Sequence, residues 1–322
     1  MPEQEKVDNN NAPADVVPEG ENIFEEKATV ETKVENSDQS SVIPPENSRI
    51  DVGLDADIFQ VQPDILKNTI HIVAQSKGGT GKTQVASYLA SFFQRHSENL
   101  DLYCFDLDSN TMSFAAFKAF NVQQFSEVVV QDGEINIDAT QFDGAFNPIL
   151  ESINTDSTVV IDTGAGGSFW SLVNYIRDLD YPSLAAATER QWRFIIHVVI
   201  SGSAREESKD ALERLHEFID NPYVEFVIWG NEFFGELKGF YDEIAIKYGE
   251  MFQRNVNLPG IKDARLRKSL EKMRLKNWSV TELFIDPECN AIDKARINQY
   301  FYGNLAGKPG VFRQLQYLDW II

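Results

Sequence analysis

Cysteine is scarce in this sequence. The two cysteines, Cys104 and Cys289, lie far apart in a chain of 322 residues. Because of their number and spacing, we do not expect a cysteine-rich zinc site, an iron–sulfur cluster or a disulfide scaffold. The four histidines show no metal-ligand spacing either, and we expect them to be structural: His71, His96, His197 and His216.

Long apolar runs are also missing. The N-terminus has neither a basic segment nor an apolar stretch, and no apolar run elsewhere approaches the ~18 residues that a membrane-spanning helix needs. The apolar segment from Gly310 to Ile322 carries only Arg313 and Asp319 as charges, so we expect it to dock on the core or at an interface rather than on a membrane. These features predict a soluble, cytoplasmic protein.

Basic residues are too few to balance the acidic ones. The chain has 29 Lys and Arg against 50 Asp and Glu, a net charge of −21, which argues against a protein that grips nucleic acid over its whole surface. The first 60 residues hold 15 of the acids and only 4 of the bases, among many Pro, Asn and Ser. We predict that residues 1–62 form a disordered acidic tail, which acts either as a solubilising segment or as a partner-binding or autoinhibitory arm.

Apolar strands alternate with amphipathic helices after the tail. This pattern predicts an α/β fold with a mainly parallel, doubly wound sheet, because short continuous β-forming runs separated by helices are typical of buried parallel strands. The expected strands span residues 69–74, 102–105, 158–161, 194–200 and 224–229. The expected helices span residues 82–95, 169–179, 206–219 and 239–252.

A glycine-rich segment joins the first expected strand to the first expected helix. Backbone N–H groups of such a loop, together with the helix N-terminus, cradle phosphate oxygens, whereas a turn without a ligand is the structural alternative. Lys82 would neutralise the β- and γ-phosphates and the Thr83 hydroxyl would ligate Mg²⁺. The expected nucleotide-binding residues are Gly78, Gly79, Thr80, Gly81, Lys82 and Thr83.

This loop departs from the ordinary phosphate-loop pattern at two positions. Ser76 replaces the usual glycine, and a second lysine, Lys77, precedes Lys82 by five residues. Two ammonium groups on one short loop repel each other unless negative charge lies between them, so Lys77 is well placed beside a triphosphate. The alternative is a solvated loop lysine.

The run Lys77-Gly78-Gly79-Thr80-Gly81-Lys82-Thr83 resembles the deviant Walker A box of the ParA/MinD ATPases. The resemblance implies a P-loop NTPase that binds ATP and Mg²⁺ and forms a homodimer around the nucleotide. In that family the residue that matches Lys77 reaches the partner's phosphates, so Lys77 and Lys82 are both candidate catalytic residues.

Aspartates follow two of the expected strands, where a parallel sheet binds its ligands. Asp106 and Asp108 end the second strand, and Asp162 ends the third. By resemblance, Asp108 positions the attacking water, Asp106 lies near the water shell of Mg²⁺, and Asp162 is the Walker B aspartate that holds the metal with Thr83. The family's usual residues after the second aspartate are replaced by Ser-Asn, so Asp108 has the alternative role of capping a helix that begins near Thr111.

Asn231 follows the last expected strand. An amide can donate to and accept from an adenine edge, and the same position reads adenine in ParA/MinD-like proteins, although a simple turn asparagine is the alternative. No Asn-Lys-x-Asp box for guanine occurs, which favours ATP.

One basic cluster stands out on this acidic chain. From Lys262 to Lys276 there are seven bases and two acids on an expected helix. The cluster is a solvated helix face, a contact for DNA or RNA phosphates, or a contact for the tail or another protein.

Softer motifs narrow the resemblance to the TraL branch of these ATPases, from conjugative plasmid transfer. They are the segments 162–170, 197–202, 226–231 and 258–262. The resemblance implies an ATPase domain at residues 63–285, a C-terminal helical extension at 286–322, and a slow, dimeric ATPase switch for conjugation or for positioning or partitioning a DNA or secretion complex. Expected partners are conjugation, relaxosome or secretion-system proteins. The alternatives are a nucleotide-bound adaptor with little turnover and a metabolic ligase or kinase.

Overall fold

The structure is a computed structural model that describes residues 68–96, 101–108, 111–124, 130–131, 134–135, 146, 150, 157–305 and 307–318. All of them belong to one unit, Ser41–Ile322. The expected acidic tail, residues 1–62, lies outside the described residues.

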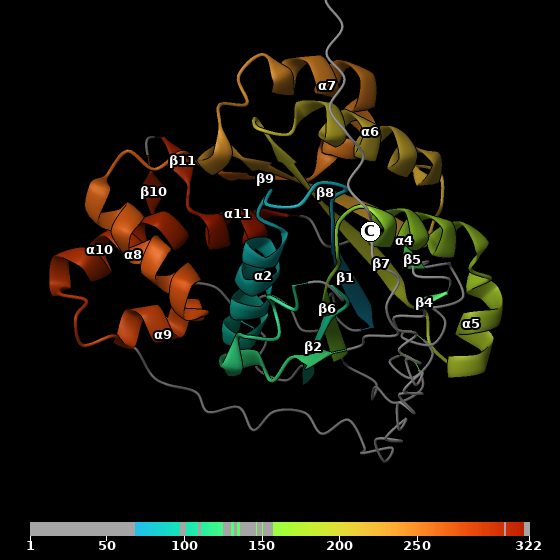
Figure 1. The fold of residues 1–322 in the computed structure, drawn as a ribbon, viewed down its shortest axis with the longest axis horizontal. Coiled ribbons are helices and arrows are strands. Elements are labelled where there is room, and N and C mark those ends of the chain that lie inside the picture. The colour runs from blue at the N-terminus through green and yellow to red at the C-terminus, as the bar shows by residue number, and fades with distance from the viewer. Residues whose placement is uncertain are drawn as a thin grey trace, which may run out of the picture. The chain divides into compact units, whose positions relative to one another are not determined.

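A seven-stranded sheet forms the centre of the fold, and its strand order is β3-β2-β6-β1-β7-β8-β9 (Figure 1). Every neighbouring pair in this sheet is parallel. The strands are β1 (Thr69–Ala74), β2 (Asp101–Asp106), β3 (Gln123–Gln124), β6 (Ser157–Asp162), β7 (Arg193–Ser201), β8 (Val224–Asn231) and β9 (Asn255–Leu258). The five strands expected from the sequence are confirmed, and β3 and β9 extend the sheet at its two edges.

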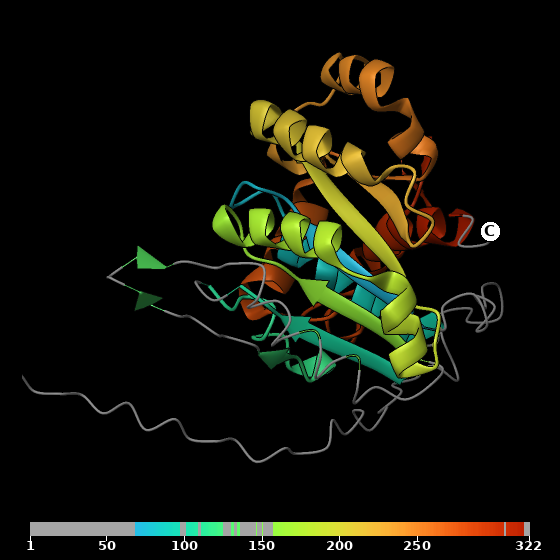
Figure 2. The same cartoon turned by 90° about the vertical axis from the view of Figure 1, so that its right-hand side faces the viewer.

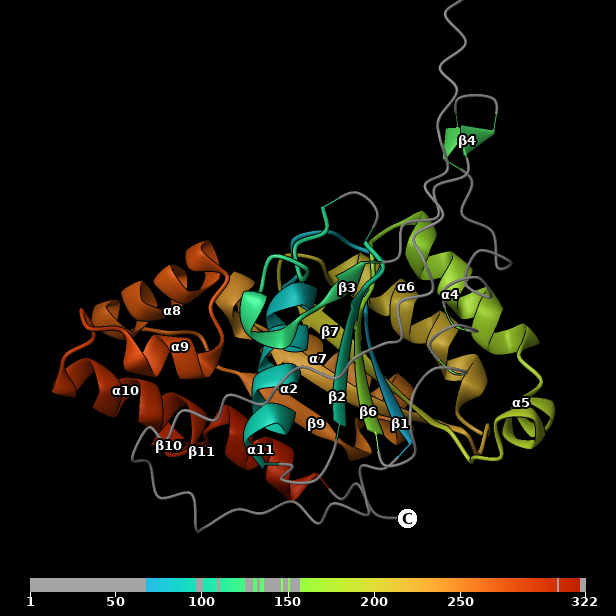
Figure 3. The same ribbon diagram turned by 90° about the horizontal axis from the view of Figure 1, so that it is seen from below.

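Helices cover both faces of this sheet (Figures 2 and 3). One buried cluster joins the sheet to α2 (Lys82–His96), α8 (Ala264–Lys276), α9 (Val280–Ile285), α10 (Ala291–Phe301) and α11 (Val311–Tyr317). A second cluster joins the other face to α4 (Gly167–Asp178), α5 (Tyr181–Thr188), α6 (Arg205–Leu215) and α7 (Phe240–Tyr248). Burial on both faces explains why β1 and β6 have no exposed residue. The expected α/β fold with a doubly wound sheet is confirmed.

Among the described residues, two antiparallel strand pairs lie outside the main sheet. Strand β4 (Val130–Gln131) pairs with β5 (Glu134–Ile135), and β10 (Asn304–Leu305) pairs with β11 (Lys308–Pro309).

The C-terminal helices pack directly on α2. The ring of Phe92 on α2 lies 5.6 Å from that of Phe312 on α11, and Phe301 on α10 is fully buried in the same cluster. The Gln314 side chain accepts from the backbone N–H of Asn257 at 2.7 Å and donates to its carbonyl at 2.9 Å, which pairs the open edge of β9. Helix α11 therefore docks on the core, as its apolar spacing predicts. The division into residues 63–285 and 286–322 stays a prediction.

Two of the histidines form a buried hydrogen-bonded chain across the sheet. The Trp229 indole N–H donates to His197 Nδ1 at 2.9 Å, and His197 Nε2 lies 2.9 Å from His71 Nδ1. His71 Nε2 lies 3.2 Å from Thr69 Oγ1. Because an indole nitrogen only donates, His197 must donate through Nε2 and His71 must donate to Thr69. Burial is the main cause that lowers the pKa of His71 well below its usual range and that of His197 to about 3, so both rings are neutral.

Within the described ranges, every helix is too short or too polar to cross a bilayer.

Candidate functional site

The glycine-rich loop connects β1 to α2 at the carboxyl edge of the sheet. Gly79 and Gly81 adopt left-handed φ angles of +74° and +102°, which favour glycine. A Cβ on Gly81 would come within 2.6 Å of Asn231 Nδ2, so this position also needs the absence of a side chain. The Lys82 ammonium donates to the Lys77 carbonyl at 3.2 Å, which folds the loop around it.

Lys82 is a buried cation at the start of α2, with only 7% of its surface exposed. Burial lowers the pKa of its ammonium, while the nearby Asp162 and Asp108 carboxylates raise it. A cation held in a partly desolvated loop beside a helix N-terminus is suited to bind a polyanion.

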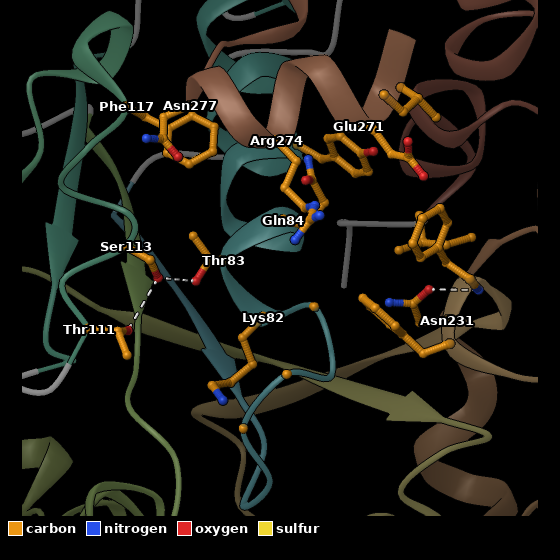
Figure 4. A pocket seen from close by; sticks show the side chains of 18 of the residues that line it. Lys82, Thr83, Gln84, Thr111, Ser113, Phe117, Asn231, Glu271, Arg274 and Asn277 are labelled. Atoms are coloured by element: carbon orange, nitrogen blue, oxygen red, sulfur yellow. Dashed lines mark hydrogen bonds between the residues drawn. The ribbon is translucent and has the colours of Figure 1, made fainter. Parts of the chain in front are cut away.

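Thr83 and Asp162 form the second part of the site. The Thr83 hydroxyl donates to Asp162 Oδ2 at 2.6 Å. It also lies 2.8 Å from the Ser113 hydroxyl, as Figure 4 shows. The other carboxylate oxygen, Asp162 Oδ1, is buried and has no hydrogen-bond partner among the described residues. Buried polar atoms are normally paired, so the unpaired oxygen indicates a ligand that does not belong to the chain.

Burial raises the pKa of Asp162 to about 8, against the hydrogen bond from Thr83 and the charge of Lys82, which lower it. The negative charges of Asp106 and Asp108 raise it further. A divalent cation at this position would offset the desolvation of the carboxylate. In the described part of the chain, no group of three His, Cys, Asp or Glu side chains could hold a metal by itself.

Asp106 uses both carboxylate oxygens inside the fold. Oδ1 accepts the backbone N–H of Asp108 at 3.0 Å, and Oδ2 accepts those of Phe114 and Ala115 at 2.8 and 2.9 Å. These bonds anchor the segment after β2 beside Thr83. Burial raises the pKa of this carboxyl, whereas the three backbone donors lower it. The predicted role in the metal's water shell stays a prediction.

Asp108 lies at the wall of the same site and closes a turn. Its carboxylate accepts the Thr111 backbone N–H at 3.2 Å and the Thr111 hydroxyl at 2.8 Å. The expected helix near Thr111 is not formed: the described residues from Thr111 to Phe117 form turns, and the next helical turn spans Lys118–Phe120. The water-positioning role of Asp108 stays a prediction beside this turn-closing role.

Lys77 points away from the loop toward α6. Its ammonium lies 3.0 Å from Glu207 Oε1, and 53% of its side chain is exposed. The Ser76 hydroxyl, at the position where the ordinary pattern has glycine, donates to the Glu207 carbonyl at 3.2 Å. Helix α6 therefore holds the segment before the glycines, which the sequence did not indicate.

Asn231 lies beside the loop, and its amide has two partners within the chain. Nδ2 donates to the Thr80 carbonyl at 2.9 Å, and Oδ1 accepts the Phe233 N–H at 3.1 Å. These bonds tie β8 to the phosphate loop. A base-reading role for Asn231 stays a prediction.

One cavity of about 740 Å³ lies beside the glycine-rich loop (Figure 4), and Lys77, Asp106 and Asp162 are not among the residues that line it. It is lined at one end by Gly78, Gly79, Gly81, Lys82 and Thr83, and by Asp108 and Asn231 at its sides. The lining that the sequence did not indicate includes Glu271, Arg274 and Asn277 of the α8 region, which lie across from Lys82 in Figure 4, and also Leu270 of α8, Tyr88 of α2 and Tyr300 of α10. The basic composition of α8 was the only signal that could have pointed to it.

Comparison with known proteins gives two similar sequences. Both are named TraL and come from Escherichia coli; one is 29% identical over 256 residues, covering 76% of this chain and 96% of the relative. The other is 24% identical over 235 residues, covering 71% of this chain and 92% of the relative. No family model matches the sequence.

Solved structures with a similar chain trace include the following two, both at low similarity. A plasmid partition protein of Borrelia burgdorferi B31 bound to AMPPNP has a TM-score of 0.40 and 14% identity, covering 66% of this chain and 90% of that one. The MinC:MinD cell division complex of Aquifex aeolicus has a TM-score of 0.40 and 12% identity, covering 71% of this chain and 92% of that one.

The sequence likeness to TraL extends over most of this chain. This chain is thus a relative of the proteins named TraL, as its motifs predict.

Proposed function

We propose that this protein binds Mg-ATP at the glycine-rich loop and hydrolyses it slowly as a dimeric molecular switch. The observation that carries the proposal is a cavity at a helix N-terminus, lined by the buried Lys82 and by Thr83, whose hydroxyl donates to the buried Asp162 carboxylate with its one unpartnered oxygen. This set of groups matches what a metal-bound triphosphate requires.

The backbone of the loop, Lys82 and Asn231 have distinct roles in this proposal. The backbone N–H groups from Gly78 to Thr83 receive the phosphate oxygens, and Lys82 neutralises their charge without having to leave its buried position. Asn231 keeps the loop in place through Thr80. Pre-positioned donors lose little entropy on binding, so the loop would bind the phosphates largely as it stands.

Mg²⁺ fits the donor set because it prefers hard oxygen ligands and is normally shared between protein and phosphate. The Thr83 hydroxyl and Asp162 would hold it, with Asp106 behind them. The ion would neutralise phosphate charge during transfer. The raised pKa of Asp162 is consistent with a carboxyl that is stable as an anion only when a cation is near.

Hydrolysis needs a group that orients water, and Asp108 is the candidate. It lines the cavity, and its oxygen lies near Gly164, where a Cβ would come within 3.5 Å of Asp108 Oδ1. Its present hydrogen bonds with Thr111 would have to loosen for this task, which favours slow turnover.

A dimer would form around the nucleotide if Lys77 leaves Glu207 and reaches the phosphates of the partner subunit. The ion pair is exposed, so it contributes little and is easily exchanged for a polyphosphate. Dimerisation would then depend on the triphosphate.

The similarity to the proteins named TraL supports the further proposal that this switch acts in conjugative plasmid transfer, with conjugation, relaxosome or secretion-system proteins as partners in the cytoplasm. A contact with DNA phosphates is a further part of the proposal. Several exposed bases of the Lys262–Lys276 cluster form no ion pair with any described residue: Lys262, Arg265, Lys268 and Lys276. A DNA contact there would weaken steeply with salt.

Titration calorimetry with Mg-ATP tests the proposal. Lys82→Ala should lose measurable ATP binding, and unchanged affinity would refute the loop as the nucleotide site. Asp108→Ala should still bind ATP but release phosphate much more slowly than the parent chain. Phosphate release by Asp108→Ala at the parent rate would show that Asp108 takes no part in hydrolysis. Absence of turnover in the parent chain would favour the adaptor alternative.

A further inference from the structure

Helix α8 forms the wall of the nucleotide cavity opposite the phosphate loop, and one of its bases reaches into that cavity. Arg274 lies in the last turn of α8 and lines the cavity together with Lys82. In Figure 4 its side chain extends from α8 toward the side of α2 that carries Gln84. The Arg274 side chain is thus the second base of the cavity lining, on the wall that faces Lys82.

Two other bases of the cluster have partners, whereas Arg274, an exposed residue at the cavity rim, has none among the described residues. Lys272 lies 2.5 Å from Asp286 and 2.7 Å from Glu288, and Arg267 donates to the Ile261 carbonyl. The guanidinium of Arg274 forms no hydrogen bond or ion pair with any described residue. Glu271, one turn earlier on the same wall, is likewise too far away for an ion pair with it.

We infer that Arg274 binds the phosphate chain of the nucleotide and thereby fastens α8 to it. An unpaired guanidinium with five donors is suited to phosphate oxygens, and the apolar surroundings of Tyr88 and Leu270 in the cavity strengthen such a contact. The inference rests on the proposed nucleotide site. It separates Arg274, the base of the cluster that lines the cavity, from bases that are paired within the chain or exposed away from the cavity.

Binding of Mg-ATP and Mg-ADP to the full chain, measured by calorimetry at fixed salt, tests the inference. Arg274→Ala should weaken both affinities about tenfold or more, because a hydrogen bond to a charged group is worth at least that factor. Arg274→Lys keeps the charge but loses the fork of donors, so its affinities should lie between those of the parent chain and those of Arg274→Ala. Lys276→Ala is the matched control: it removes a base of the same helix that does not line the cavity, and it should stay within about twofold of the parent.

Hydrogen exchange of α8 provides the second readout. Nucleotide should protect the α8 amides in the parent chain and in Lys276→Ala, and saturating nucleotide should protect them less in Arg274→Ala. Equal affinities and equal protection in Arg274→Ala and Lys276→Ala would overturn the inference. If Lys82→Ala abolishes binding while Arg274→Ala has no effect, only this inference fails; if Lys82→Ala also has no effect, the proposed nucleotide site fails.

Discussion

The buried chain Trp229–His197–His71–Thr69 predicts how stability responds to acid. Both histidines are neutral in the folded protein because their pKa values are lowered, chiefly by burial. In the unfolded chain they titrate near 6.5. Between the folded and unfolded pKa values the unfolded state binds more protons, so the stabilising contribution is complete above about pH 6.5 and is lost as the pH falls.

The size of the effect follows from linkage. At pH 5, an unfolded histidine of pKa ~6.5 gains about 2 kcal/mol from protonation that a folded histidine of much lower pKa does not gain. The two rings together should lower the free energy of unfolding by about 4 kcal/mol between pH 7.5 and 5, apart from the contributions of other groups.

A variant isolates one ring from the other groups. His71→Asn keeps an oxygen that can accept from His197 but removes a titrating group, so it should be less stable at every pH and lose about 2 kcal/mol less than the parent between pH 7.5 and 5. Urea unfolding at several pH values measures this difference. Thr69→Val serves as the control, because it removes the hydroxyl that ends the hydrogen-bonded chain but does not remove a titrating group. Parallel pH curves for the parent and His71→Asn would refute a neutral, buried His71.

Two further predictions concern the loop. Gly81→Ala should weaken ATP binding measured by calorimetry, because its left-handed φ and a Cβ within 2.6 Å of Asn231 Nδ2 would force the loop to shift. Gly78→Ala is the control, because a Cβ there meets open space, and it should have a smaller effect. Equal affinities in the two variants would contradict this prediction. Glu207→Gln should lower the ATP concentration needed for dimer formation by a few fold at most, because it releases Lys77 from an exposed pair. An unchanged or higher concentration in light scattering would show that the pair does not restrain Lys77.

The central strands and the phosphate loop could be predicted because their signals are local. Continuous β-forming runs such as residues 194–200 need no knowledge of their neighbours to be read as buried strands, and the step from β1 to the loop to α2 is contiguous in the chain. Strand β9, with the sequence Asn-Val-Asn-Leu, contains no continuous β-forming run, because polar residues interrupt it. Its edge is paired by the distant side chain of Gln314, which motif spacing does not indicate.

The surroundings of the site depend on contacts between distant segments. The bonds from Asp106 to Phe114 and Ala115, and the ion pair of Lys77 with Glu207, cannot be read from motif spacing. The same holds for α8, whose bases look like one solvated cluster in the sequence. Only the position of α8 beside the cavity separates Arg274 from the others.

The most direct test of the switch is the mass of the chain in solution with different nucleotides, measured by light scattering. Asp108→Ala with Mg-ATP, which should bind but not turn over, is predicted to have twice the 36.5 kDa mass of one chain. The same variant with Mg-ADP is predicted to have the mass of one chain. An identical mass with ATP and with ADP, at nucleotide concentrations shown by calorimetry to saturate the site, would contradict an ATP-dependent dimeric switch.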